Sequence, residues 1–131
     1  MKKSDLEKIV DKRCRHLQKE QAGLGENVEA NHNFRVELKK LRALLRLLRH
    51  NGEQSHSFHL PKSLHQLYGA VGDVRSYQLQ KTFVNLACKE LAYPVPTGYM
   101  ALLHRLEQEA IMRVKEKAKL VSVADLPEQL V

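Results

Sequence analysis

The segment from Asn31 to Asn51 repeats an apolar residue at alternating steps of four and three positions. Such spacing returns the side chains to one face of an α-helix, which turns once in about 3.6 residues. The apolar series is Phe34, Leu38, Leu41, Leu45 and Leu48. A half-buried strand would instead alternate with a period of two. The segment therefore predicts an amphipathic helix whose apolar seam must be covered by other elements.

Three further segments have helical spacing, and short breaks containing Gly or Pro separate them. Ser4, with Glu7 three residues later, forms a capping box that predicts the start of the first helix at Ser4. The expected helices occupy residues 4–21, 28–50, 61–91 and 98–120. The breaks lie at 23–25, 51–52 and 93–96.

Four helices joined by short connections predict an all-α fold, an antiparallel up-down four-helix bundle. The 131 residues suit one domain, residues 1–131. Gly69 and Gly72 would permit a kink in the third helix, and the tail from Val121 to Val131 is expected to be extended or weakly helical.

The cysteines and the lengths of the apolar runs indicate where in the cell the protein is expected. Cys14 and Cys88 lie far apart without metal or redox spacing, which predicts free, buried or half-buried thiols in a reducing cytoplasm. The first residues lack the apolar core of a signal peptide, and no apolar run approaches membrane-spanning length. We therefore expect a cytoplasmic protein without a membrane partner.

A stripe of cations lies beside the apolar seam of residues 31–51. Its members follow the seam residues by one position, or about 100° of helical rotation, and His32 precedes them by three residues. We call this set the basic stripe: His32, Arg35, Lys39, Arg42, Arg46 and Arg49. It spans about 25 Å along the helix.

The basic stripe has a cost, because neighbouring cations on a helix repel by a few tenths of a kcal/mol per pair. Within this helix only Glu37 offers compensation. One interpretation is a solvated face, or one neutralised by acids of another helix such as Glu107 or Glu109. The other is a linear track for a linear anion, since the planar guanidinium matches two phosphate oxygens at once. The net charge of +7 agrees with an anionic partner but does not require one.

Residues 32–46, HNFRVELKKLRALLR, resemble the signature helix of the CHAD family, the conserved histidine α-helical domain. The shared features are a His, an Arg three residues later, a basic pair, and further Arg residues at helical spacing among leucines. Residues 67–75, LYGAVGDVR, resemble the leucine-rich helix of the same family, which ends in Gly-x-x-Arg. The resemblance implies a helical bundle that binds inorganic polyphosphate without catalysis, often at polyphosphate granules or beside triphosphate-processing domains.

The sequence departs from the family pattern in two ways. Ser76 and Gln78 stand where the family usually has Asp. If those acids orient the basic residues, the site is looser here; if they only hold neighbouring helices, binding survives. Family domains also commonly contain two four-helix repeats, whereas this chain suffices for one CHAD-like half unit. We therefore expect two chains to associate as a homodimer.

The basic stripe and the resemblance together give candidate polyphosphate ligands. Lys40 joins the stripe as an edge residue about 100° from Lys39. Arg49 could instead complement the helix dipole, and His32 could instead bond a nearby carboxylate. Small residues at Gly69 and Gly72 would let a helix or the ligand approach closely. Candidates on the third and fourth helices are Lys62, His65, Arg75, Arg105 and Arg113.

Two other functions stay open. A nucleic-acid binder would also use a basic helix, although the stripe has no Asn or Gln pair for base edges and Tyr68 and Tyr77 are better placed for packing between helices. A scaffold for an acidic protein partner is the third reading. An enzyme is disfavoured, because no nucleotide-binding glycine loop, nucleophile motif or paired carboxylates are present. No cofactor or metal is expected.

Overall fold

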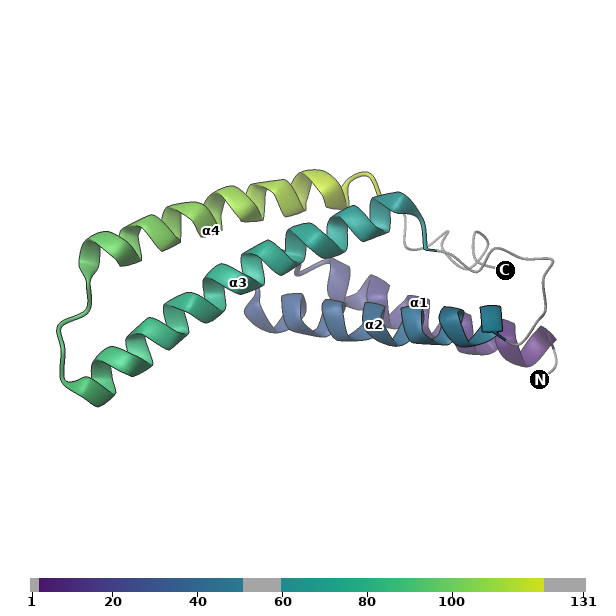
Figure 1. Cartoon of the computed structure of the whole chain (residues 1–131). Helices are drawn as coiled ribbons and strands as arrows, with labels where there is room; N and C mark the ends of the chain where they lie inside the picture. Colours follow the sequence, from purple (N-terminus) through teal and green to yellow (C-terminus); the bar gives the residue numbers. More distant parts are fainter. Residues whose placement is uncertain (1–2, 51–59, 122–131) are drawn as a thin grey trace.

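The computed structural model describes residues 3–50 and 60–121, which contain four α-helices and no strand (Figure 1). The side chains of residues 3–4, 6–7 and 48–50 lie outside this description. The helices are α1 (Lys3–Gln21), α2 (Val28–His50), α3 (Lys62–Leu91) and α4 (Thr97–Ala118). The predicted all-α fold is confirmed.

The helix boundaries differ from the predicted ones by one or two residues, the usual uncertainty at helix ends. α1 begins at Lys3, so Ser4 lies in its first turn and not at the expected N-cap position. α3 begins after Pro61, which is its N-cap, and α4 runs from Thr97 to Ala118 rather than from Gly98 to Leu120. The predicted break at 51–52 and the tail beyond Val121 lie outside the described residues.

Local interactions explain where the helices start and stop. The Asn27 side chain accepts a hydrogen bond of 3.0 Å from the Ala30 backbone N–H and so caps the N-terminus of α2. Gly25 has φ +106°, which glycine adopts without the strain of a Cβ. α3 ends where Ala92 takes a left-handed conformation, and its backbone N–H returns to the Lys89 carbonyl. α3 continues as one uninterrupted helix through Gly69 and Gly72.

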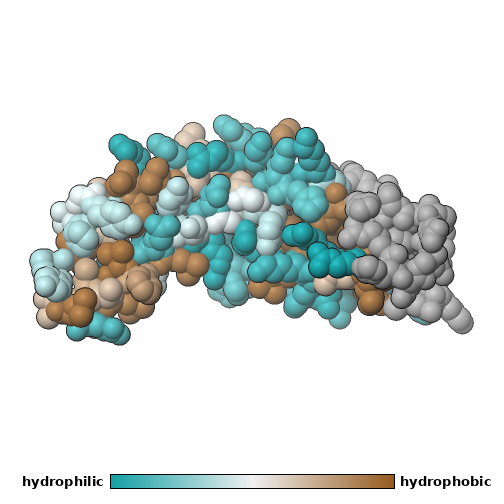
Figure 2. Space-filling model, in the orientation of Figure 1, coloured by the Kyte–Doolittle hydropathy of each residue, from teal (hydrophilic) through white to brown (hydrophobic). Residues whose placement is uncertain are grey.

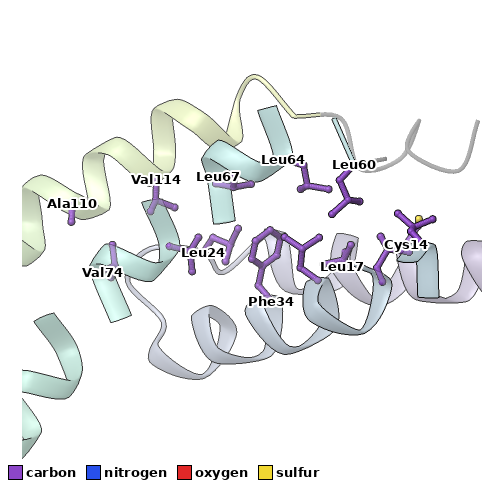
Figure 3. Packing of buried hydrophobic residues seen from close by; sticks show 14 of the residues in the cluster. Cys14, Leu17, Leu24, Phe34, Leu60, Leu64, Leu67, Val74, Ala110 and Val114 are labelled. Carbon is purple, nitrogen blue, oxygen red and sulfur yellow. The ribbon is translucent and has the colours of Figure 1, made fainter. Parts of the chain in front are cut away.

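The core lies between α1, α2 and the first half of α3, with the second half of α4 covering one side (Figure 3). The predicted seam residues Phe34, Leu38, Leu41 and Leu45 are all buried. They pack in one cluster with residues from the other three helices, among them Cys14, Leu17, Leu64, Leu67, Val71, Val74, Ala110 and Val114. None of the described helices has a stretch apolar and long enough to cross a bilayer.

The α3–α4 hairpin projects beyond the end of the α1–α2 pair (Figure 1). We call this level, at which the α1–α2 pair ends, the step. It lies near Gln78, whose side chain is bonded to Asn31 in the first turn of α2. Beyond it, Leu79, Phe83 and Leu86 of α3 remain exposed. The projection arises because α2 begins beside Gln78, near the middle of the 30-residue α3, so the rest of α3 runs past the end of α2.

A buried amide fixes the turn between α1 and α2. The fully buried Asn31 accepts a hydrogen bond of 2.8 Å from the Gly25 N–H and donates one of 2.9 Å to the Gly25 carbonyl. Its Nδ2 also donates to Gln78 Oε1 at 3.3 Å, which joins α2 to α3. Buried polar groups need such partners, so one side chain sets both the turn and the level of the step.

Replacing Asn31 with Ala should therefore lower the free energy of unfolding by about 2 kcal/mol or more, because two backbone groups of Gly25 lose their partner in a buried place. Urea denaturation measures the change. Asn33→Ala is the control, since Asn33 is half-buried beside a cleft and bonds no described residue; its effect should stay within about 0.5 kcal/mol. Equal losses in the two variants would contradict this role of Asn31.

Both cysteines are free thiols, as predicted, with Cys14 buried and Cys88 half-buried. Burial, aided by the charge of Asp11, raises the pKa of the Cys14 thiol to about 11.

Because only the thiolate reacts, iodoacetamide should alkylate Cys88 in the folded protein at pH 8 and leave Cys14 unmodified. Mass spectrometry of native and urea-unfolded samples checks this; comparable modification of the two thiols in the native sample would refute it.

Candidate functional site

One arginine of the basic stripe lies in the contact between α2 and α3. The half-buried Arg35 donates from Nη1 to the Tyr68 backbone carbonyl at 3.0 Å and from Nη2 to the Tyr68 hydroxyl at 3.2 Å. Its guanidinium carbon also lies 4.1 Å from the centroid of the Tyr68 ring, a cation–π distance. Arg35 is thus held in place by a single residue of the neighbouring helix.

The absence of a side chain at Gly72 makes room for this contact. A Cβ built at Gly72 would collide with the Arg35 guanidinium, whereas one at Gly69 would meet no atom within 4 Å. The expectation that both glycines allow a close approach therefore holds only for Gly72, and what approaches is Arg35 of α2. Gly69 faces open space.

A second stripe arginine shares the same aromatic ring. The guanidinium carbon of Arg42, two turns after Arg35, lies 5.8 Å from the Tyr68 ring centroid. From the sequence we expected Tyr68 only to pack between helices, and its proximity to two stripe arginines was missed. A signal was present, since Tyr68, Gly72 and Arg75 recur at steps of four and three and so share a face of α3.

Three further residues of the basic stripe are open to solvent. His32, Lys39 and Arg46 are exposed, and the side chain of Arg49 lies outside the described residues. Within residues 3–50 and 60–121, none of Arg35, Lys39, Arg42 and Arg46 has a carboxylate oxygen within 4.0 Å. The four described Lys and Arg residues of the stripe therefore keep their charge without an acidic partner in this part of the chain.

The two acids of α4 that the sequence offered as neutralising partners do not pair with the stripe. Glu107 is buried and lies 2.9 Å from Lys81 Nζ and 3.7 Å from His104 Nδ1. It therefore does not pair with the stripe, as one interpretation of the sequence proposed. Glu109 is exposed on α4 and has no ion pair within the described region.

Glu37, near the middle of α2, faces α1. It lies 3.5 Å from Arg13, 3.6 Å from His16 and 3.4 Å from Lys40. Glu37, His16 and Lys40 border a cleft of about 310 Å³ between α1 and α2. Lys40 thus lies on the side of α2 that faces α1, whereas Arg35 and Arg42 contact Tyr68 of α3.

The candidate residues on α3 and α4 also lie in different places. Lys62 and His65 are exposed within the first turns of α3, with His65 three residues before Tyr68. Arg75 is half-buried and borders a second cleft of about 230 Å³, at the step where α2 begins at Val28. Arg105 and Arg113 are exposed on α4, which packs mainly on α3, so they lie away from the α2 stripe.

The two departures from the family pattern have different surroundings. Gln78 is buried and accepts the hydrogen bond from Asn31 of α2. Ser76 is exposed and accepts one from Gln80 at 3.2 Å. Neither bonds a basic residue, and Gln78 holds two helices together.

The described residues contain no group of three or more His, Cys, Asp or Glu side chains that could hold a metal ion. The chemistry at the α2–α3 edge is therefore that of cations and one aromatic ring, which together suit an anion.

The two glycines give a matched test of the Arg35 contact. Gly72→Ala should displace the guanidinium from Tyr68 and lose its charged hydrogen bonds, about 1–3 kcal/mol, while alanine's helix preference returns about 1 kcal/mol. The free energy of unfolding should therefore fall by up to about 2 kcal/mol. Gly69→Ala should raise it by up to about 1 kcal/mol, since alanine favours the helix and meets no atom. In a protein that already carries Arg35→Ala, Gly72→Ala should no longer lower the free energy of unfolding. If the effects of the two substitutions on this free energy simply add in urea denaturation, the contact is disproved.

The chain was compared with known proteins. No curated protein and no solved structure matches it. The family model described as the CHAD domain matches residues 8–128, nearly the whole chain, in agreement with the resemblance of the α2 and α3 motifs. The protein therefore belongs to the CHAD domain family.

Proposed function

We propose that this protein binds inorganic polyphosphate along the edge where α2 meets α3. The CHAD family is associated in general with polyphosphate and triphosphate binding. The observation that carries the proposal to this edge is the row of four stripe cations without an acidic partner among the described residues. Such a row repels itself unless an anion compensates it.

The cations divide into fixed and adjustable ones. Arg35 has both terminal nitrogens engaged by Tyr68, so it supplies positive potential from a fixed place. Lys39 and Arg46 are exposed and can adjust to phosphate oxygens, with His32 and His65 at either end of the same edge. Arg42 lies between the two groups, near the Tyr68 ring. Charge-assisted hydrogen bonds from these residues to successive phosphates would hold a linear chain.

The replacement of two family acids is compatible with binding. Gln78 is engaged in holding α2 against α3, which supports the reading that this position serves helix packing and not the orientation of cations. Lys40, Arg105 and Arg113 lie away from this edge, and we assign them secondary roles as distant positive charge.

The proposed activity is binding without catalysis, since the CHAD domain is generally a binding domain. A cytoplasmic location and an association with polyphosphate granules are part of the proposal. The two free thiols agree with a reducing compartment.

A titration with long-chain polyphosphate tests the proposal. The variant Lys39→Ala/Arg42→Ala/Arg46→Ala should bind at least tenfold more weakly, because each charge-assisted hydrogen bond contributes about 1.5–3 kcal/mol. Arg35 is left intact, since its loss would also affect the α2–α3 contact. Isothermal titration calorimetry at low and physiological salt measures the affinity.

The matched control removes three cations from exposed positions on α1, in Lys8→Ala/Lys12→Ala/Arg15→Ala. It has the same net charge as the stripe variant and should bind nearly as well as the unaltered protein. Parallel titrations with duplex DNA and single-stranded RNA compare affinity per phosphate. Equal losses of polyphosphate affinity in the two variants would reject a specific polyphosphate site. The site would also be rejected if nucleic acids bound as tightly as polyphosphate and all affinities fell together with salt.

A further inference from the structure

The projecting half of α3 has one face whose composition the proposed function does not use. Its residues recur at steps of four, four, three and four, which keeps them on one side of the helix: Arg75, Leu79, Phe83, Leu86 and Glu90. The three apolar ones are 52%, 73% and 56% exposed. Figure 2 shows hydrophobic surface gathered on this projecting end of the hairpin. We call these five residues the α3 face.

The α3 face carries opposite charges at its two ends. Arg75 stands at the step and Glu90 near the tip, about 22 Å further along the helix. Neither forms an ion pair with any described residue. The face therefore reads, in chain order, as a cation, three exposed apolar side chains and an anion.

Such an order is complementary to itself when two copies run in opposite directions. An antiparallel pair centred on Phe83 sets Arg75 of each copy opposite Glu90 of the other, and Leu79 opposite Leu86. The two Phe83 rings then meet at the centre, where aromatic side chains contribute most to an interface. A parallel pair would instead place like charges together. We propose that a second copy of this chain pairs antiparallel with the first through the α3 face.

The shape of the molecule permits this pairing. The α1–α2 pair stops near Gln78, so the segment from Leu79 to Leu91, about 20 Å long, is not covered by α2. Two such segments can overlap while the α1–α2 pairs lie at opposite ends of the dimer. The contact would bury on the order of 1,000 Å², the lower end for a specific interface, which predicts a weak dimer with a micromolar dissociation constant.

Sedimentation velocity over a concentration series tests the pairing without any polyphosphate, so its outcome is independent of the proposed function. Phe83→Glu places two carboxylates at the centre of the interface and should leave only monomer. Met112→Glu is the matched control, because Met112 is 65% exposed on α4 and outside the face. It should dimerise like the unaltered protein. Circular dichroism checks that both variants stay helical.

A mixing experiment tests the antiparallel register. Arg75→Glu alone and Glu90→Arg alone each create two like-charged pairs in a homodimer, which should weaken it roughly tenfold. A mixture of the two variants restores opposite charges at both ends, so a heterodimer should form with about the original affinity. Native mass spectrometry distinguishes the species. A monomer at every concentration, equal effects of Phe83→Glu and Met112→Glu, or no heterodimer in the mixture would overturn the proposal.

Discussion

The contact between Arg35 and Tyr68 ties α2 to α3 beside the buried apolar seam. Two hydrogen bonds and a ring at 4.1 Å join one side chain of α2 to one residue of α3. Hydrogen bonds to a charged group contribute about 1.5–3 kcal/mol, and a partly desolvated cation–π contact about 1–2 kcal/mol. Gly72 leaves room for this contact, because a Cβ there would collide with the guanidinium unless the Arg35 side chain moved. The rest of the stripe is positioned from this point.

The basic stripe combines a structural and a binding role in neighbouring turns of one helix. Arg35 is half-buried and engaged, while Lys39 and Arg46 remain exposed. Because Arg35 is fixed against α3, the backbone positions of the exposed cations are also fixed along α2. Less conformational entropy is then lost when these cations bind a ligand. The acids of the chain are directed elsewhere: Glu37 towards α1 and Glu107 towards Lys81. This separation preserves positive potential along the α2–α3 edge.

The same fold leaves an apolar surface at its other end. The Asn31–Gly25–Gln78 hydrogen bonds stop the α1–α2 pair at a defined level, and α3 continues past it. Leu79, Phe83 and Leu86 are therefore exposed because they lie on α3 beyond the level at which α2 begins. The proposed anion site and the proposed dimer face lie on different parts of α3, so they can be tested separately.

Local periodicity by itself determined the helices, their breaks and the buried seam. Phe34, Leu38, Leu41 and Leu45 are all in the core, and each described helix lies within one or two residues of its predicted range. The stripe was also readable, since a shift of one residue on a helix is a fixed rotation. Periodicity gives the positions of these cations on the helix, and the polyphosphate titration measures what they bind.

Tertiary structure decided which neighbour each side of α2 meets. Periodicity separates Lys39 from Lys40 by about 100° but cannot say that Lys40 faces α1 and Glu37, while Arg35 faces α3. It also could not select Lys81 over the stripe as the partner of Glu107. The reason is physical: contacts between helices far apart in sequence depend on their crossing and relative level, which the turn at Gly25 and the Asn31–Gln78 bond set, and no single helix encodes them.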